Sequence, residues 1–372
     1  MKVLMSDKPI WIGQACLRPF CRYIVSDYEA MYYMHHTQYT GWKMSSFNAW
    51  ERRYGGQDLN EKKVCVYRHA AFGDQLMVSA IPHYLATVFP KATIHFYCEA
   101  DVASLWDGNP FIGGSAIPLP IPFDVARSYD YHIFYEGILE NNSEPDQNCC
   151  YDDMFGMIGL NDVPDQFKRP HIRPKPSDYE WIKGLQIDKN GKYLVYHVSP
   201  ANKNRCYPVK QGIQFIRQFV RHYKDWSVYL VGTERDQYPE LNDLTKKYKG
   251  RVFNLLDKAK EFRSLIPLIE RASLVVCPDS SIMHLAASFP HVPVISLWGL
   301  FAPEDRVKYY PNHWALVAKD ICPHAPCRNH NFNLPKENCK DALGYCEDSV
   351  YCPAIAAIDP DNIMAKVREI LG

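Results

Sequence analysis

Residues 274–298 read LVVCPDSSIMHLAASFPHVPVISLW. The runs at 274–277 and 292–298 are short, apolar and rich in β-branched residues, which is typical of buried strands. The segment between them, 282–288, is expected to be a helix. A strand, a helix and a second strand in this order form a parallel βαβ unit. The stretch therefore predicts an α/β fold with a parallel sheet.

The same alternation extends through most of the chain in two blocks. The first block predicts strands at 64–67, 92–98 and 131–135, and a helix at 75–89. Pro82 is expected to kink or shorten this helix, because proline lacks a backbone N–H. In the second block, strands are predicted at 193–198, 227–231, 251–255, 274–277 and 292–298, and helices at 209–223, 234–248, 262–270 and 282–288. Each block predicts a doubly wound, Rossmann-like domain.

Length and linker composition divide the chain further. A chain of 372 residues is long enough for two domains. Residues 164–183 are rich in proline and charge, which is typical of a linker. We expect an N-terminal extension, two Rossmann-like domains facing a cleft, and a cysteine-rich segment with a closing helix at 361–371 capped by Asp359 or Asp361. Their predicted bounds are 1–60, 61–175, 185–320 and 321–372.

Composition favours a cytoplasmic globular protein. Hydrophobic residues make up 47% of the chain, and 42 basic residues balance 42 acidic ones. A net charge of zero gives no long-range attraction to nucleic acid or to anionic membranes. The first residues, MKVLMSDKPIWIG, lack the apolar run of a signal peptide. The longest apolar stretch contains Asp279 and three prolines, which disfavours a transmembrane helix.

The loop after the first predicted strand contains Gly73 and Asp74. Gly73 would allow a tight turn close to a ligand. Asp74 would stand at the start of the next helix, where it could cap the helix or act as a general base toward a substrate hydroxyl. Local chemistry favours the cap, because the helix dipole stabilises the carboxylate and lowers its basicity.

Two loops of the second block carry groups suited to a diphosphate. Lys203 and Arg205 follow a predicted strand, where they could neutralise a departing diphosphate or be solvated surface cations. Ser280 and Ser281 open a helix, and the free N–H groups of a first helical turn bind anions. With Ser281 as the cap, His284 could face the same anion, unless it is a buried structural histidine.

A fourth loop carries Glu234, which could bind a ribose or a base edge, as acids do in other doubly wound folds. The alternative is an ordinary helix start capped by Thr233. The sequence contains no GxGxxG, P-loop, HExxH or GxSxG motif. Nicotinamide chemistry, P-loop hydrolysis and serine hydrolysis therefore lack their usual signatures.

Together, these loops resemble glycosyltransferase family 9, the bacterial ADP-heptose:lipopolysaccharide heptosyltransferases, which have the GT-B fold. Residues 73–82, GDQLMVSAIP, are similar to the family's Gly-Asp opening, and 89–94, FPKATI, to its FPxAxI. The strongest likeness is VCPDSSIMHLAA at 276–287, which is similar to the family's D-[ST]-G-x-x-H-x-A-A. The resemblance covers 64–328, most of the chain.

The resemblance implies an inverting, metal-independent transfer of a sugar from a nucleotide-diphosphate sugar to an acceptor hydroxyl, without a cofactor. The first Rossmann-like domain would bind the acceptor and the second the nucleotide sugar. Asp74 matches the family's general base, with Arg68 and Gly73 on the acceptor side of the cleft. Residues that match the donor site are Lys203 (or Arg205 if the loop shifts), Asp279, Ser280, Ser281, His284 and, more loosely, Glu234.

The chain departs from the family at three places. Ser281 replaces a glycine, residues 197–200 replace an HPG-like turn, and residues 1–60 have no counterpart. These departures leave the donor sugar and the acceptor open, although a glycan or lipopolysaccharide-type acceptor is implied. The aromatic-rich N-terminus could stack on bases, so transfer to a hydroxylated base in DNA is one alternative. A nucleotide-sugar epimerase and a non-catalytic nucleotide-binding module are two others.

Five of the 13 cysteines lie close together near the C-terminus. They are Cys322, Cys327, Cys339, Cys346 and Cys352. Five thiols in a short segment could hold a structural zinc ion, although no CxxC pair is present. A local disulfide cluster or reduced thiols fit the same spacing.

Overall fold

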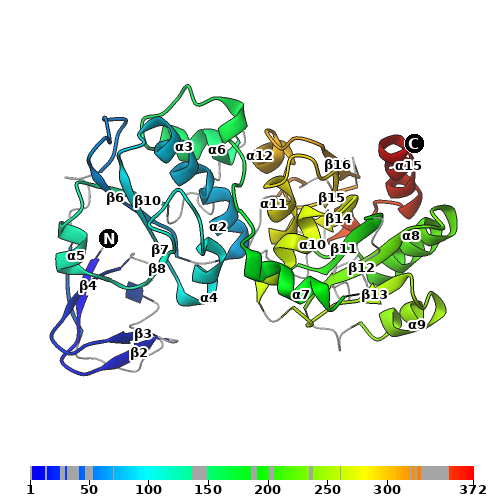
Figure 1. Ribbon diagram of the computed structural model, residues 1–372, viewed down its shortest axis with the longest axis horizontal. Helices are drawn as coiled ribbons and strands as arrows, with labels where there is room; N and C mark the ends of the chain where they lie inside the picture. The colour runs from blue at the N-terminus through cyan, green and yellow to red at the C-terminus, as the bar shows by residue number, and fades with distance from the viewer. Residues whose placement is uncertain are drawn as a thin grey trace. The chain divides into compact units, whose positions relative to one another are not determined.

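The computed structural model contains two compact units (Figure 1). The first comprises Met1–Asn142 and Cys150–Arg173, and the second comprises Ser143–Cys149 and Pro174–Gly372. The structure describes residues 2–12, 15–25, 30–31, 42–46, 53–69, 71–135, 149–185, 191–200, 205–233, 238–259, 261–318, 321–322, 325–327 and 352–372. Within these residues, no helix is long and apolar enough to cross a membrane.

A four-stranded parallel sheet forms the centre of the first unit, in the order β10-β6-β7-β8. Its strands are β6 (Lys63–Tyr67), β7 (Thr93–Cys98), β8 (Ile117–Pro118) and β10 (Tyr131–Phe134). Its helices are α2 (Phe72–Val78), α3 (Ala80–Val88), α4 (Ala100–Ala103), α5 (Phe123–Arg127) and α6 (Cys150–Gly156). The chain passes from β6 to β7 on one side and later returns to pair β10 on the other. The sheet therefore has a topological switch point between β6 and β10.

The helix predicted at 75–89 is two helices, α2 and α3, which meet at Ser79. Pro82 has no N–H to donate to the carbonyl of Val78, so the helical hydrogen bonds are interrupted one turn before the proline. Ser79 Oγ donates to the carbonyl of Leu76 and accepts from the backbone N–H of His171 at 2.7 Å. The break predicted from Pro82 is thus present and is stabilised by a serine.

Three N-terminal strands belong to a small antiparallel sheet. Its order is β5-β1-β4-β9, with β1 (Lys2–Met5), β4 (Arg22–Val25), β5 (Lys43–Ser46) and β9 (Ile121–Pro122), and a separate hairpin joins β2 (Ile10–Ile12) to β3 (Ala15–Leu17). Ile24 of β4 packs with Cys65, Tyr67 and Ile121 in one hydrophobic cluster. The N-terminal sheet therefore shares a core with the parallel sheet of the first unit.

The second unit is built on a six-stranded parallel sheet in the order β13-β12-β11-β14-β15-β16. The strands are β11 (Tyr193–Ser199), β12 (Ser227–Gly232), β13 (Val252–Asn254), β14 (Leu274–Pro278), β15 (Val294–Trp298) and β16 (His313–Val317). The helices are α7 (Tyr179–Lys183), α8 (Val209–His222), α9 (Glu240–Lys247), α10 (Ile266–Glu270), α11 (Ser281–Ala287), α12 (Glu304–Val307), α14 (Pro353–Ala356) and α15 (Pro360–Leu371). Because β12 and β14 flank β11 on opposite sides, the switch point lies between β11 and β14.

The closing helix α15 packs on α8, as Figure 1 shows in red and green. Phe215 and Phe219 of α8 lie in one hydrophobic cluster with Ile363 and Val367 of α15. Of the two predicted caps, Asp359 is correct, since its side chain accepts from the backbone N–H of Asp361 at 2.8 Å.

Three elements of the second unit differ from their predictions. The helix predicted at 234–248 is described only from Glu240, with Pro239 at its N-cap, so Thr233 is not the cap of this helix. The helix predicted at 262–270 begins as the 3-10 turn η7 (Phe262–Leu265) before α10. Strand β16 was not predicted, because its residues are half-buried or exposed and lack the apolar run of a central strand.

Candidate active site

The switch point of the second sheet brings two of the polar loops together. His197 and Ser199 lie at the end of β11, and Ser280 follows β14. His197 Nδ1 lies 2.9 Å from Ser280 Oγ, and both side chains are buried. This contact fixes the start of α11 against the end of β11. Doubly wound sheets bind their ligands at this position, where neighbouring strands end and the strand order reverses.

Asp279 lies between two arginines at the same edge. Asp279 is only 4% exposed. Arg306 Nη1 lies 3.2 and 3.0 Å from the two carboxylate oxygens of Asp279, and Arg205 Nη1 lies 3.5 Å from Asp279 Oδ2. Two guanidinium groups favour the ionised form of a buried carboxylate. Asp279 therefore orients two cations at the edge of the sheet.

Arg205 is the described cation best suited to a ligand at this edge. Its contacts with Asp279 are long, its side chain is 18% exposed, and its Nε has no hydrogen-bond partner among the described residues. Arg306 is more buried and packs 3.9 Å from the ring centroid of Phe301. A guanidinium binds phosphate oxygens through paired N–H groups, so Arg205 retains the chemistry for a diphosphate. The predicted Lys203 and Glu234 lie outside the described residues.

His284 is buried in α11 and bonded within the unit. Its Nδ1 lies 2.7 Å from the hydroxyl of Tyr310, and burial lowers its pKa to about 3, Asp279 opposing the shift. The ring is thus neutral near pH 7. Ser280 is the N-cap of α11 and Ser281 its first residue, so the prediction of Ser281 as the cap is wrong. His284 consequently lies one residue deeper in the helix than predicted.

Buried histidines make the second unit sensitive to acid. Burial lowers the pKa from 6.5 to about 4 for His197 and to about 3 for His284 and His313. Below pH 6.5 the unfolded chain binds protons that the folded chain does not, so stability falls as the pH decreases toward 3. We expect denaturant midpoints to drop steadily from pH 7 to pH 4. His313→Gln should reduce this slope, and the exposed His222→Gln should not; equal slopes in both variants would contradict the assignment.

In the first unit, the switch point between β6 and β10 holds Asp74 and Arg68. Arg68 Nη2 donates to Asp74 Oδ2, and Arg68 Nη1 donates to the carbonyl of Tyr135, directly after β10, at 2.8 Å. Asp74 is the third residue of α2, whose N-cap is Ala71. The interpretation of Asp74 as the helix cap is therefore wrong. Gly73 lies inside α2, and the turn before the helix is made by Ala71, with a φ of 66°.

Side chains around Asp74 fix the beginning of α2. Gln75 is fully buried, its Nε2 donates to the carbonyl of Arg68 at 2.9 Å, and its Oε1 accepts from Trp106 Nε1 at 2.9 Å. His69 Nε2 lies 3.0 Å from Glu99 Oε1, just after β7. The carboxylate of Asp74 is thus partly exposed on a helix start that buried hydrogen bonds hold in place.

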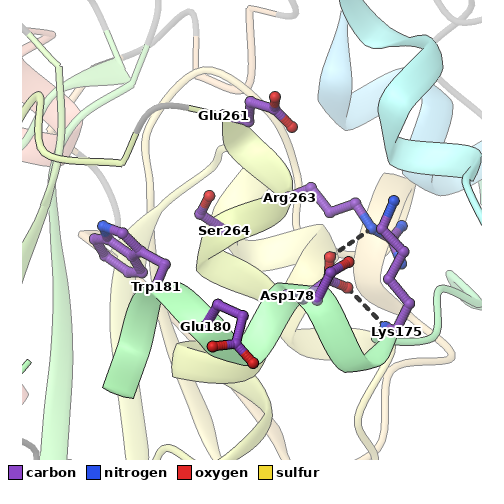
Figure 2. Close-up of a pocket in the computed structure, with 8 residues that line it drawn as sticks. Lys175, Asp178, Glu180, Trp181, Glu261, Arg263 and Ser264 are labelled. Atoms are coloured by element: carbon purple, nitrogen blue, oxygen red, sulfur yellow. Dashed lines mark hydrogen bonds and ion pairs between the residues drawn. The ribbon is translucent and has the colours of Figure 1, made fainter. Parts of the chain in front are cut away.

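A cavity of about 470 Å³ lies at the start of α7, away from the residues predicted from the sequence. Figure 2 shows dashed lines that join Asp178 to Arg263 and to Lys175. Arg263 Nε lies 2.9 Å from Asp178 Oδ1, and the backbone N–H of Lys175 donates to Asp178 Oδ2 at 2.7 Å. These contacts tie the start of the second unit to η7. None of the candidate site residues lines the cavity.

Residues 175–336 match the model of glycosyltransferase family 9 (heptosyltransferase), and this region contains the switch-point residues of the second sheet. This part of the chain is therefore similar to a family 9 domain. The protein is heptosyltransferase-like, and the strand order of its two parallel sheets agrees with the expected α/β, GT-B fold class. A search of the curated proteins finds no significant match.

Solved structures similar to this chain share its fold at low sequence identity. A family 9 glycosyltransferase from Veillonella parvula has a TM-score of 0.63 and 13% identity, with 85% of this chain and 98% of that chain covered. The ADP-heptose lipopolysaccharide heptosyltransferase II of E. coli has a TM-score of 0.59 and 14% identity, with 83% and 98% covered. The dodecameric, iron-containing heptosyltransferase TibC, in complex with ADP-D-beta-D-heptose, has a TM-score of 0.53 and 12% identity, with 100% and 90% covered.

The cysteine-rich end of this heptosyltransferase-like chain is only partly described. Cys322, Cys327 and Cys352 are half-buried, and burial raises the pKa of Cys352, with smaller contributions from the other two. Cys339 and Cys346 lie outside the described residues. Within the described part of the chain, no three His, Cys, Asp or Glu side chains are grouped as a metal site.

Two residues of the candidate site were not found from the sequence. Arg306 follows β15 by eight positions and carries no motif, although it comes from a strand-end loop like the others. His197 was noted only as a departure from the family's turn. Its place on a buried strand next to the switch point is the signal that could have identified it.

Proposed function

We propose that this chain transfers a sugar from a nucleotide-diphosphate sugar to an acceptor hydroxyl with inversion. The observation that carries the proposal is Arg205, a partly exposed arginine whose Nε has no hydrogen-bond partner among the described residues, at the switch point of a region that matches family 9. Structures of similar heptosyltransferases in complex with ADP or ADP-heptose support an ADP-sugar donor, with heptose the first candidate. A glycan or lipopolysaccharide-type acceptor follows from the same relatives.

In the proposed reaction, Asp74 takes the proton of the acceptor hydroxyl as its oxygen attacks the anomeric carbon of the donor. The bond from that carbon to the diphosphate breaks, and the nucleoside diphosphate leaves with the bonding electrons. Arg205, the hydroxyl of Ser280 and the backbone N–H of Ser281 are proposed to stabilise the charge that develops on the leaving group. Lys203, Asp279, His284 and Glu234 stay proposed donor-site residues.

These observations support the three alternative functions less well. Transfer to a base in DNA, epimerisation of a nucleotide sugar and non-catalytic nucleotide binding gain no support from the family match or the heptosyltransferase structures. A structural zinc ion at the C-terminal cysteines stays a separate proposal, which metal analysis of the purified full chain would test.

Thermal unfolding with nucleotide sugars tests the donor directly. A ligand present at 100 times its Kd stabilises the folded state by about 2.7 kcal/mol. We expect ADP-heptose to raise the Tm more than matched UDP-, GDP- and CMP-sugars, because ADP is the nucleotide in the related complexes. A larger shift with another nucleotide would replace the ADP assignment. No shift with any of the four would contradict a nucleotide-sugar site.

A further inference from the structure

Arg68 is a buried cation fixed on several sides. Its side chain is 3% exposed, and its backbone N–H donates to the carbonyl of Tyr97 at 3.0 Å. Its two terminal nitrogens contact Tyr135 and Asp74. The residue therefore links the ends of β7 and β10 to the beginning of α2. A guanidinium held in this way has little freedom to follow a moving partner.

The side chain of Asp74 is less enclosed than that of Arg68, so Arg68 limits the orientations that the carboxylate can take. Its side chain is 24% exposed, whereas the neighbouring Gln75 is fully buried and hydrogen-bonded. The backbone of α2 is thus fixed next to Asp74, but the carboxylate orientation depends on its own contacts. Two other ionisable groups at this edge, His69 and Glu99, contact each other at 3.0 Å.

We propose that Arg68 is the positioning residue for Asp74, holding its carboxylate ionised and in one orientation for proton transfer. The inference rests on the proposed function, in which Asp74 is the general base. A neighbouring opposite charge favours the ionised form of a carboxylate, and proton transfer requires the base within hydrogen-bond reach of the hydroxyl. Arg68 therefore acts through Asp74 and has no separate contact with substrate in this role.

The contact between Arg68 and Asp74 also favours the loss of the proton that Asp74 takes up in the reaction. When the acceptor oxygen bonds to the anomeric carbon, its proton passes to Asp74 and the nucleoside diphosphate leaves with the electron pair. Asp74 is then neutral beside the buried charge of Arg68. That charge favours the return of Asp74 to its ionised form, with the proton released to solvent through the exposed part of the side chain.

Two substitutions separate charge from geometry. Arg68→Lys keeps the charge but cannot maintain both contacts with Tyr135 and Asp74, and Arg68→Met removes the charge at similar length. The measurement is the pH dependence of kcat/KM for ADP release from ADP-heptose with a truncated lipopolysaccharide core as acceptor. The ¹³C chemical shift of the Asp74 carboxyl, assigned by comparison with Asp74→Asn and followed as a function of pH, gives the titration midpoint of Asp74 without turnover.

In Arg68→Met we expect the acidic limb of the profile and the Asp74 titration to move to higher pH by at least about one unit. Arg68→Lys should lower kcat about tenfold and leave both midpoints near those of the wild type. Unchanged midpoints in Arg68→Met would overturn the inference. Full activity in Asp74→Asn would instead contradict the proposed function, so the two failures are distinguishable. Unchanged Tm in both Arg68 variants would confirm that they fold.

Discussion

Asp74→Asn is expected to lower kcat for sugar transfer by about 10² to 10⁴. Asparagine has nearly the shape of aspartate but cannot take up the proton of the acceptor hydroxyl. The substitution lies in the first unit, whereas the proposed donor residues lie in the region that matches the family 9 model. Donor affinity should therefore be unchanged. Single-turnover measurement of ADP release, at saturating donor, reports the chemical step without product release.

Asp101→Asn is the matched control for this substitution. Asp101 is an exposed acid in α4, and its side chain makes none of the contacts described around Asp74. It should turn over as the wild type does. Wild-type turnover in Asp74→Asn would remove Asp74 from the mechanism and leave the base unassigned.

Asp279→Ala is expected to destabilise the folded protein by about 3–5 kcal/mol. The substitution leaves the buried guanidinium of Arg306 without the carboxylate that accepts from it at 3.0 and 3.2 Å. Removing one partner of a buried ion pair is more damaging than removing both, because an uncompensated charge stays buried. Denaturant unfolding followed by circular dichroism measures the loss.

A surface ion pair provides the control for Asp279. Asp243 lies 3.8 Å from Lys246, and both side chains are about four-fifths exposed. Asp243→Ala should change stability by less than about 1 kcal/mol. If Asp279→Ala were no more destabilising than Asp243→Ala, the carboxylate would not be the centre of the arginine pair.

The strands and the loops that follow them could be predicted, because buried parallel strands are short apolar runs that end at polar residues. The starts of the helices were harder. Ser280 and Ser281 are equally good caps, and only the backbone conformation of Ser280 distinguishes them. Asp74 is likewise a good cap by residue type, yet the helix begins two residues before it, after Ala71.

Contacts between distant segments could not be predicted from local patterns. Arg306 reaches Asp279 across 27 positions of sequence, and Arg68 reaches the carbonyl of Tyr135 across 67. Both contacts depend on which strands become neighbours in the sheet. His284 was identified as a histidine near an anion site, and its burial against Tyr310 depends on packing that one segment does not encode.

Isothermal titration of ADP-heptose into the wild type, Arg205→Met and Asp74→Asn compares the two proposed roles in one assay. If Arg205 holds the diphosphate and Asp74 only takes the acceptor proton, Arg205→Met should bind at least about tenfold more weakly, because charge-assisted bonds to phosphate are lost. Asp74→Asn should bind like the wild type. Wild-type affinity in Arg205→Met would contradict the assignment of the donor site to the edge between β11 and β14.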